Sequence, residues 1–187
     1  MTALILSIVL LTNGAYRVAY DTEARGPAWV AYDLEPEEVV TAPRAPFAFR
    51  ADPRVPESDV AADYAGSGYD RGHMAPAADF NFDRDALEST YLLTNILPQE
   101  PKLNRGAWAQ YEAELRELAR RGTVHILAYP EYDAGVTNLM GRVRIPDAFV
   151  KVASGWFGVR HRRFDNRRTD DKAANDGGKH NGSERAE

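Results

Sequence analysis

Short apolar runs separated by turn residues occupy the beginning of the chain. Tyr16–Tyr20 and Ala28–Leu34 are rich in aromatic and β-branched side chains, and Arg25-Gly26-Pro27 lies between them. Runs of this kind are typical of β-strands joined as a hairpin or meander. The preceding apolar run, Ala3–Leu11, ends just before the turn pair Asn13-Gly14 and predicts a buried strand. We therefore expect the chain to begin with antiparallel sheet.

A helical pattern follows later in the chain. Its apolar side chains recur mostly at steps of three and four residues, at Leu103, Trp108, Tyr111, Leu115 and Leu118. With Gly122 as the stop signal, this spacing predicts a helix over residues 104–121 that buries one face. Val124–Tyr129 and Val143–Val152 are then predicted to be strands, and Pro146 places the second at an edge or a bulge.

The remaining segments are predicted to be irregular. Residues 35–68 contain five prolines and little periodicity, which indicates a long connection of the kind that is usually functional or mobile. Residues 165–187 are charged and nearly free of large apolar side chains, so they predict a disordered tail. We therefore expect one α+β domain over residues 1–164, with a central antiparallel sheet, followed by that tail.

Composition narrows the class of protein. A length of 187 residues, 44% hydrophobic and 27% charged, suits one globular domain, and the net charge of −5 argues against a polycation that coats nucleic acid. Because the chain has no cysteine, disulfides, thiolate metal sites and cysteine nucleophiles are excluded. The four histidines are too far apart for a paired-histidine zinc motif, which makes a zinc hydrolase a weak alternative.

Basic side chains gather near the end of the predicted domain. Residues 142–168 hold eight basic and two acidic side chains. Six of the basic residues form a candidate phosphate-contacting patch: Arg142, Arg144, Lys151, Arg160, Arg162 and Arg163. The alternative is an ordinary solvated face, since many basic clusters bind nothing.

One short segment concentrates residues suited to phosphate chemistry. Gly66–Met74 contains three glycines and the run Asp70-Arg71-Gly72-His73. Glycines allow a backbone to approach a ligand closely. Histidine exchanges a proton near neutral pH, and the planar arginine fork can hold two phosphate oxygens. The alternative is a structural histidine beside an arginine in a surface ion pair.

Two polar residues of the predicted helix could hold a cation. Asn104 lies at the predicted start and Glu112 eight residues later, about 80° apart around a straight helix and about 12 Å apart along it. One of them could bind Mg²⁺ directly while the other holds a water on the ion. The alternatives are an N-cap asparagine and an exposed helix glutamate.

Three separate motifs occur in order along the chain: Tyr64–Pro76, Thr94–Gln99 and Leu103–Trp108. They resemble the DNA/RNA non-specific endonuclease family, and with the upstream strands the resemblance covers roughly residues 13–152. Three motifs in the right order are far more specific than one, so the chain is identified as a member of this family.

The resemblance implies a ββα-metal (His-Me finger) active site. By that resemblance, His73 is the general base that activates water for attack on a phosphodiester. Asn104 is the direct protein ligand of a single Mg²⁺, for which Mn²⁺ or another divalent cation could substitute, and Glu112 holds a metal-bound water. A metal in this position stabilises the charge that develops on the phosphate.

The resemblance also assigns supporting residues. Asn95 and Gln99 match polar positions that orient and support the site. Arg71 matches the arginine near the scissile phosphate, and Arg44 matches a second one upstream. Asp70 is expected to fix the turn before His73 and is left out of the catalytic set.

These assignments predict a metal-dependent phosphodiesterase, an endonuclease that cuts DNA and RNA without sequence preference because it contacts the phosphate backbone. The alternative is a catalytically weak or inactive nucleic-acid-binding remnant, because after Val152 the chain departs from the family's pattern. A homodimer is an open expectation, and the sequence does not reveal whether an inhibitor protein binds.

The N-terminal run does not decide where the protein acts. Ala3–Leu11 has nine residues, well short of the roughly 20 that span a bilayer, so no membrane span is expected. The family is often exported or organellar, which favours a secreted or periplasmic protein. However, no Lys or Arg precedes the run and Thr12–Ala15 is a poor cleavage site, so a cytoplasmic location stays open.

Overall fold

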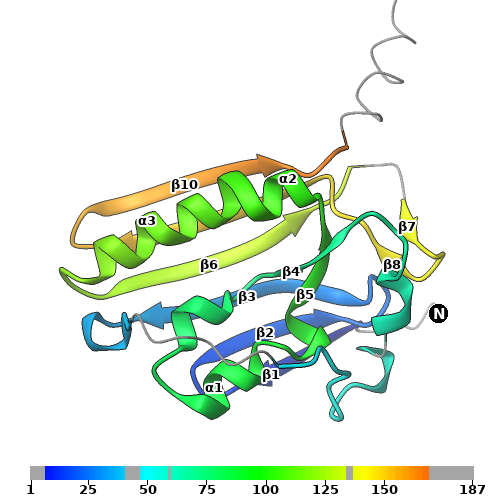
Figure 1. Cartoon of the computed structure of the whole chain (residues 1–187), viewed down its shortest axis with the longest axis horizontal. Coiled ribbons are helices and arrows are strands. Elements are labelled where there is room, and N and C mark those ends of the chain that lie inside the picture. Colours follow the sequence, from blue (N-terminus) through cyan, green and yellow to red (C-terminus); the bar gives the residue numbers. More distant parts are fainter. Residues whose placement is uncertain (1–6, 41–46, 59, 134–136, 169–187) are drawn as a thin grey trace, which may run out of the picture.

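A six-stranded antiparallel sheet forms the centre of the computed structural model, which describes residues 7–40, 47–58, 60–133 and 137–168 (Figure 1). Its strands lie in the order β1-β2-β3-β6-β9-β10. Their bounds are Ile8–Thr12 (β1), Tyr16–Asp21 (β2), Gly26–Leu34 (β3), Val124–Glu131 (β6), Ala148–Gly155 (β9) and Gly158–Asp165 (β10). The sheet and its helices give the predicted α+β fold.

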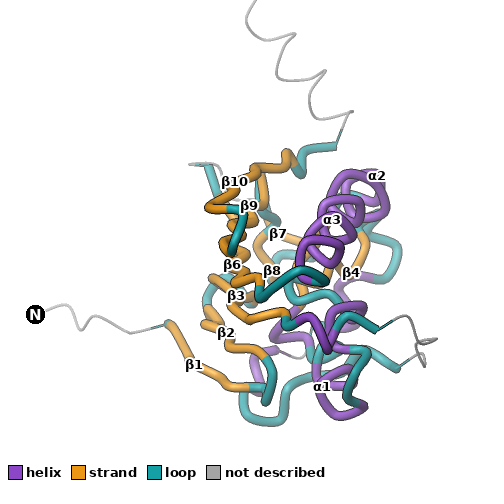
Figure 2. The backbone as a smooth tube through the Cα atoms, turned by 90° about the vertical axis from the view of Figure 1, so that its left-hand side faces the viewer, coloured by secondary structure: helices purple, strands orange, loops and turns teal. Residues whose placement is uncertain are grey.

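The helices lie on one side of this sheet (Figure 2). They are α1 (Arg84–Ser89), α2 (Pro101–Leu103) and α3 (Ala109–Ala119), and a π-helical turn, Asn104–Trp108, joins the last two. The part of the chain that the structure describes also contains five short 3₁₀-helices: Pro36–Glu38, Pro56–Ser58, Ala61–Tyr64, Ala77–Phe80 and Leu93–Asn95. In the described ranges no helix is long and apolar enough to cross a membrane.

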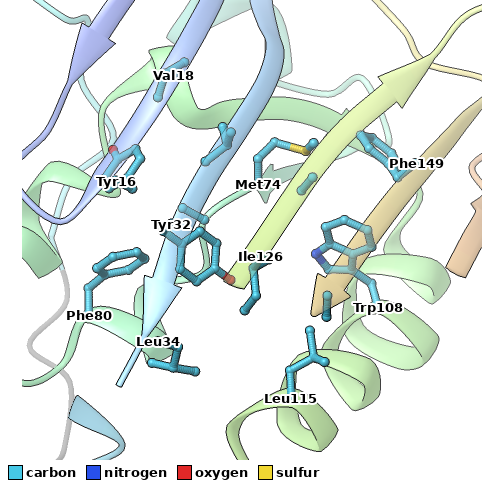
Figure 3. Close-up of a cluster of buried hydrophobic side chains, with 14 of the residues drawn as sticks. Tyr16, Val18, Tyr32, Leu34, Met74, Phe80, Trp108, Leu115, Ile126 and Phe149 are labelled. Atoms are coloured by element: carbon cyan, nitrogen blue, oxygen red, sulfur yellow. The ribbon is translucent and has the colours of Figure 1, made fainter. Parts of the chain in front are cut away.

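The main core lies between the sheet and the helices (Figure 3). Trp108 packs on Phe149, with ring centroids 5.6 Å apart, and on Phe164, at 5.3 Å. Tyr111 and Leu115 are buried on the same face of the helix, as predicted. Each large side chain buried in this way contributes roughly 1.5–3 kcal/mol to folding.

The first predicted strands are confirmed in type. β2 and β3 match the two aromatic runs, and Gly14 adopts a left-handed φ of 66° in the predicted turn. The described part of the earlier run contributes to β1, in which only Leu11 is buried and Leu10 is 71% exposed; residues 3–6 of the run lie outside the described residues. The prediction of a buried strand was wrong because β1 is an edge strand of the sheet.

The long helix begins before its predicted start. Glu100 is the N-cap, with a side-chain oxygen that accepts a hydrogen bond from the Leu103 N–H at 2.8 Å, and Pro101 is the first helical residue. Proline suits that position because its missing N–H would have no helical partner. The predicted start at Asn104 was therefore three residues late.

The predicted strand over residues 143–152 is divided. Val143–Arg144 (β8) pairs with Asn138–Leu139 (β7), and β9 begins only at Ala148, after Pro146. The edge strand β10 was not predicted, because its run of arginines resembles the start of a charged tail. Charged side chains on an edge strand also discourage pairing with other chains.

The described fold continues slightly beyond the expected domain end at residue 164. Asn166 is fully buried, and its side-chain amide donates to the backbone oxygens of Pro98 (3.1 Å) and Pro146 (2.8 Å). Its side-chain oxygen accepts a hydrogen bond from the Glu100 N–H at 2.8 Å. This residue fastens the chain after β10 to the start of α2, and most of the predicted tail, residues 169–187, lies outside the described residues.

Candidate active site

A small hairpin beside the main sheet carries the predicted histidine. Strand β4 (Asp70–His73) pairs antiparallel with β5 (Ile96–Gln99). Gly72 has no side chain at the point where Gln99 packs against this strand, and a Cβ there would lie 2.6 Å from the Gln99 Cβ. Glycine is therefore required between Arg71 and His73 because the Gln99 side chain packs on it, whereas the sequence suggested the close approach of a ligand.

Aromatic rings surround the imidazole of His73. The Tyr91 ring lies edge-on to it, with centroids 5.1 Å apart, and the Phe49 ring is tilted against it at 5.3 Å. Phe49 and Tyr91 also contact each other at 5.2 Å. This packing restricts the orientation of the imidazole, and neither aromatic residue was identified from the sequence.

Arg71 shares one of those rings. Its guanidinium lies 5.5 Å from the ring centroids of Phe49 and Tyr64 and donates a hydrogen bond to the Ala61 oxygen at 2.9 Å. The Arg71 Nε–H is buried without a hydrogen-bond partner among the described residues. A buried charged donor of this kind suits an anionic oxygen, since leaving it unmatched is costly.

Asn95 clamps the backbone that follows His73. The side chain is fully buried; its oxygen accepts a hydrogen bond from the Ala75 N–H at 2.9 Å, and its amide donates to the Ala75 and Thr90 oxygens at 2.9 Å each. The Asn95 backbone oxygen accepts another from the Met74 N–H at 3.0 Å. This geometry fits the supporting role expected for Asn95.

Gln99 is also buried, and it contacts the strand backbone at Gly72. Its side-chain amide atoms have no hydrogen-bond partner within the described part of the chain. Arg44, the other supporting residue expected from the sequence, lies outside the described residues.

Asn104 lies beside the opposite end of β4. Its side-chain amide donates to Asp70 Oδ2 at 2.9 Å, and Arg105 donates to both oxygens of the same carboxylate at 2.8 and 2.6 Å. Burial alone would raise the pKa of Asp70, but the hydrogen bonds from Arg105 and Asn104 outweigh burial and hold that pKa below its usual value. Asp70 thus does more than fix a turn, because it connects the hairpin to the helix.

The π-helical turn separates the two helix residues expected at the metal. Asn104 begins the turn, and Gly106 within it has non-helical dihedral angles, φ −111° and ψ −109°. The angular offset estimated for a straight helix between Asn104 and Glu112 therefore does not apply. Such turns occur frequently at functional sites.

Glu112 is buried against a lysine. Its Oε1 accepts a hydrogen bond from the ammonium of Lys151, on β9, at 2.8 Å. Burial raises the pKa of Glu112, and the charge of Lys151 partly opposes that rise. The alternative of an ordinary exposed helix glutamate is therefore wrong.

The six candidate patch residues do not form one patch. Lys151 is fully buried, whereas Arg142 pairs with Asp63, Arg162 with Glu114 at 3.0 Å and Arg163 with Glu131 at 2.6 Å. The other two lie on aromatic rings, Arg144 over Tyr132 and Arg160 over Phe157. Carboxylates therefore neutralise much of the charge that the sequence concentrates there.

The donor set fits a hard cation held largely by water. The amide nitrogen of Asn104 donates its hydrogen bond to Asp70, so the Asn104 amide oxygen points away from that carboxylate. Glu112 uses Oε1 for Lys151, and its side chain is 10% exposed. Among the described residues no group of three or more His, Cys, Asp or Glu could hold a metal ion.

Comparison with known proteins gives consistent matches. A family model described as DNA/RNA non-specific endonuclease matches residues 6–173. The mitochondrial endonuclease G of Homo sapiens is 40% identical over 114 residues, which are 59% of this chain and 38% of that protein. A nuclease of Nostoc sp. is 35% identical over 147 residues, which are 76% of this chain and 53% of that protein.

A third relative, the mitochondrial nuclease EXOG of Xenopus laevis, is 40% identical over 109 residues, 57% of this chain and 30% of that protein. The chain thus spans about a third to a half of the length of these three relatives. A crystal structure of the EndoG/EndoGI complex matches the fold with a TM-score of 0.76 and 26% identity, covering 84% of this chain and 74% of that one.

Proposed function

Because the chain belongs to the DNA/RNA non-specific endonuclease family, we propose that it hydrolyses phosphodiester bonds of DNA and RNA without sequence preference and with a divalent cation. Mg²⁺ is the proposed ion. Contact through backbone phosphates gives little sequence information, which agrees with non-specific cutting.

The proposed chemistry divides among residues of β4 and the helix. His73 accepts a proton from the water that attacks the phosphorus, and the aromatic rings packed on its imidazole restrict the orientation of that base. As the new bond to phosphorus forms, the P–O bond to the leaving oxygen breaks and that oxygen takes a proton from water. Arg71 donates to a phosphate oxygen through the buried Nε–H. Asn104 would hold the cation, with Glu112 accepting hydrogen bonds from water around it. The cation supplies stabilisation of the negative charge that develops on the phosphate.

One observation carries this proposal. Strand β4 holds His73 at one end and Asp70 at the other, and Asp70 is hydrogen-bonded to Asn104 at 2.9 Å. Since a strand rises about 3.3 Å per residue, Asp70 and His73 lie about 10 Å apart along β4. The Asp70 hydrogen bond therefore ties the strand that carries the proposed base directly to the residue proposed to hold the cation.

The test is cleavage of supercoiled plasmid and structured RNA by the purified protein, with Mg²⁺ and with EDTA. We expect cutting of both substrates only with the metal. His73→Ala should remove nearly all activity and leave the circular dichroism spectrum unchanged. His161→Ala, at an exposed histidine of β10, is the matched control and should cut like the wild type.

The same assay separates the proposed function from its alternative. A folded protein that shifts the plasmid on a gel without cutting it under any metal condition would overturn the nuclease proposal. Asn104→Ala should raise the Mg²⁺ concentration needed for half-maximal cutting, and an unchanged metal response would remove Asn104 from the ligand position.

A further inference from the structure

A lysine without any exposed surface lies between the sheet and the helix of the candidate site. Lys151 is on β9, and its ammonium lies 2.8 Å from Glu112 Oε1 and 4.0 Å from the centroid of the Trp108 ring. Removing an ammonium from water is costly unless it gains a partner of opposite charge, and Glu112 is that partner.

The two contacts of Lys151 fall on either side of one helical turn. Trp108 is the last residue of the π-helical turn that Asn104 begins, and Glu112 follows it by four residues. Residues four apart lie on the same helix face, so one ammonium contacts both. Arg116, a further turn along, bonds instead to Asp79 at 2.7 Å. Lys151 is therefore the cation that holds the Glu112 carboxylate.

A purely structural role explains this arrangement poorly. Apolar side chains fill such a space with no desolvation cost, and replacing buried ion pairs by them is often neutral or stabilising. Glu112 also keeps part of its side chain exposed, whereas Lys151 does not. The pair thus fixes a carboxylate at the boundary between the core and the site.

We propose that Lys151 is a positioning residue of the nuclease site. By holding Oε1 of Glu112, it sets the direction of the second carboxylate oxygen, which then accepts hydrogen bonds from water around the cation. By contacting the Trp108 ring, it also holds the helical turn that presents Asn104. This inference rests on the proposed function and adds a residue to it.

Electrostatics alone predicts the opposite result for a substitution. Removing a positive charge near a cation site strengthens cation binding. If Lys151 positions Glu112, its removal weakens binding instead, as does loss of partners that orient metal-site groups, which typically costs 10–100-fold in affinity. Lys102→Met is the matched control, because it removes an exposed lysine two residues from Asn104 without touching Glu112.

The experiment measures Mn²⁺ binding without nucleic acid, from the electron paramagnetic resonance signal of the free ion. We expect Lys151→Met to weaken binding at least tenfold, and Lys102→Met to leave it unchanged or slightly tighter. In a Glu112→Gln background, Lys151→Met should weaken binding by a clearly smaller factor, because only the contact with Trp108 is then lost. Unchanged or tighter binding in Lys151→Met, or an equal loss in both backgrounds, would overturn the inference.

The wild-type protein separates this inference from the proposed function. If it neither binds Mn²⁺ nor cuts nucleic acid, the proposed function itself fails. If it does both while Lys151→Met binds Mn²⁺ normally, only the role of Lys151 fails.

A second measurement covers the case in which Lys151→Met does not fold. In ¹⁵N-labelled wild-type protein, the buried Lys151 ammonium should give a slowly exchanging signal that persists at saturating Mg²⁺. Persistence of the signal supports a Lys151–Glu112 pair that stays formed when the metal is bound. Loss of the signal on addition of Mg²⁺ would show that the pair breaks when the ion binds, and would overturn the inference.

Discussion

Replacing Asn95 by alanine tests how the backbone after His73 is held. The change deletes three side-chain hydrogen bonds to fully enclosed backbone groups, namely the N–H and oxygen of Ala75 and the oxygen of Thr90. A buried polar group left without a partner costs about 1–3 kcal/mol. Because each carbonyl oxygen can accept a second bond, we take the lower part of that range for two of the three groups. The expected loss in unfolding free energy is about 3–5 kcal/mol.

Urea denaturation followed by circular dichroism measures this loss. With a slope of about 2 kcal/mol per molar urea, typical for a domain of this size, the midpoint should fall by roughly 2 M. Asn95→Asp keeps the acceptor for Ala75 but turns a carboxylate toward two carbonyl oxygens, so at neutral pH it should be at least as damaging. Asn138→Ala, at an exposed asparagine, should change stability by less than about 0.5 kcal/mol. An Asn95→Asp variant as stable as the wild type would refute the reasoning.

Three further predictions concern stability. Gly72→Ala should lower it by about 1–3 kcal/mol in thermal unfolding, because the new methyl would lie 2.6 Å from the Gln99 Cβ; an unchanged midpoint would contradict the packing. Burial raises the pKa of Asp52, but hydrogen bonds from Arg54 and Thr94 outweigh burial and lower that pKa. The ionised Asp52 therefore stabilises the fold above about pH 4, the ordinary Asp value, and this contribution is lost as the pH falls through the lowered pKa. Arg54→Ala should therefore flatten the acid side of the stability curve, and an unaltered curve would count against the pair. Asn166→Ala, or ending the chain at residue 164, should cost about 2–4 kcal/mol in urea unfolding, whereas ending it at residue 168 should cost little.

The strands of the main sheet were predictable where one face is buried. In β2, β3 and β6, apolar side chains either alternate with polar ones or follow one another directly. Composition and the neighbouring turn residues therefore predicted these strands. β10 lacks that signal, because its exposed arginines are typical of a solvated tail. The start of the helix was missed for a similar reason, since a glutamate N-cap followed by proline is a weaker signal than an asparagine.

The three sequence motifs indicated which residues to expect at the candidate site, but the side chains that contact those residues were not predictable. Phe49 and Tyr91 reach His73 from segments far apart in sequence, and nothing in the spacing relates them. Lys151 was assigned to a basic surface because a lysine gives no sign of burial until its partner is known. The catalytic roles of His73, Asn104, Glu112, Arg71, Asn95 and Gln99 stay predictions that the proposed variants test.

The π-helical turn from Asn104 to Trp108 has a consequence for how sequences of this kind can diverge. A π-helical turn takes about one residue more than a turn of α-helix, because its hydrogen bonds join residues five apart and not four. One deleted residue within it would therefore return the segment to a regular α-helix and leave Asn104 and Glu112 in nearly the same relative orientation. The same deletion in the regular part of the helix would rotate the residues on its two sides by about 100° relative to each other. A relative with seven residues from the asparagine to the glutamate, and not eight, could thus present both side chains as this chain does, so an alignment of this helix must allow a gap at the turn.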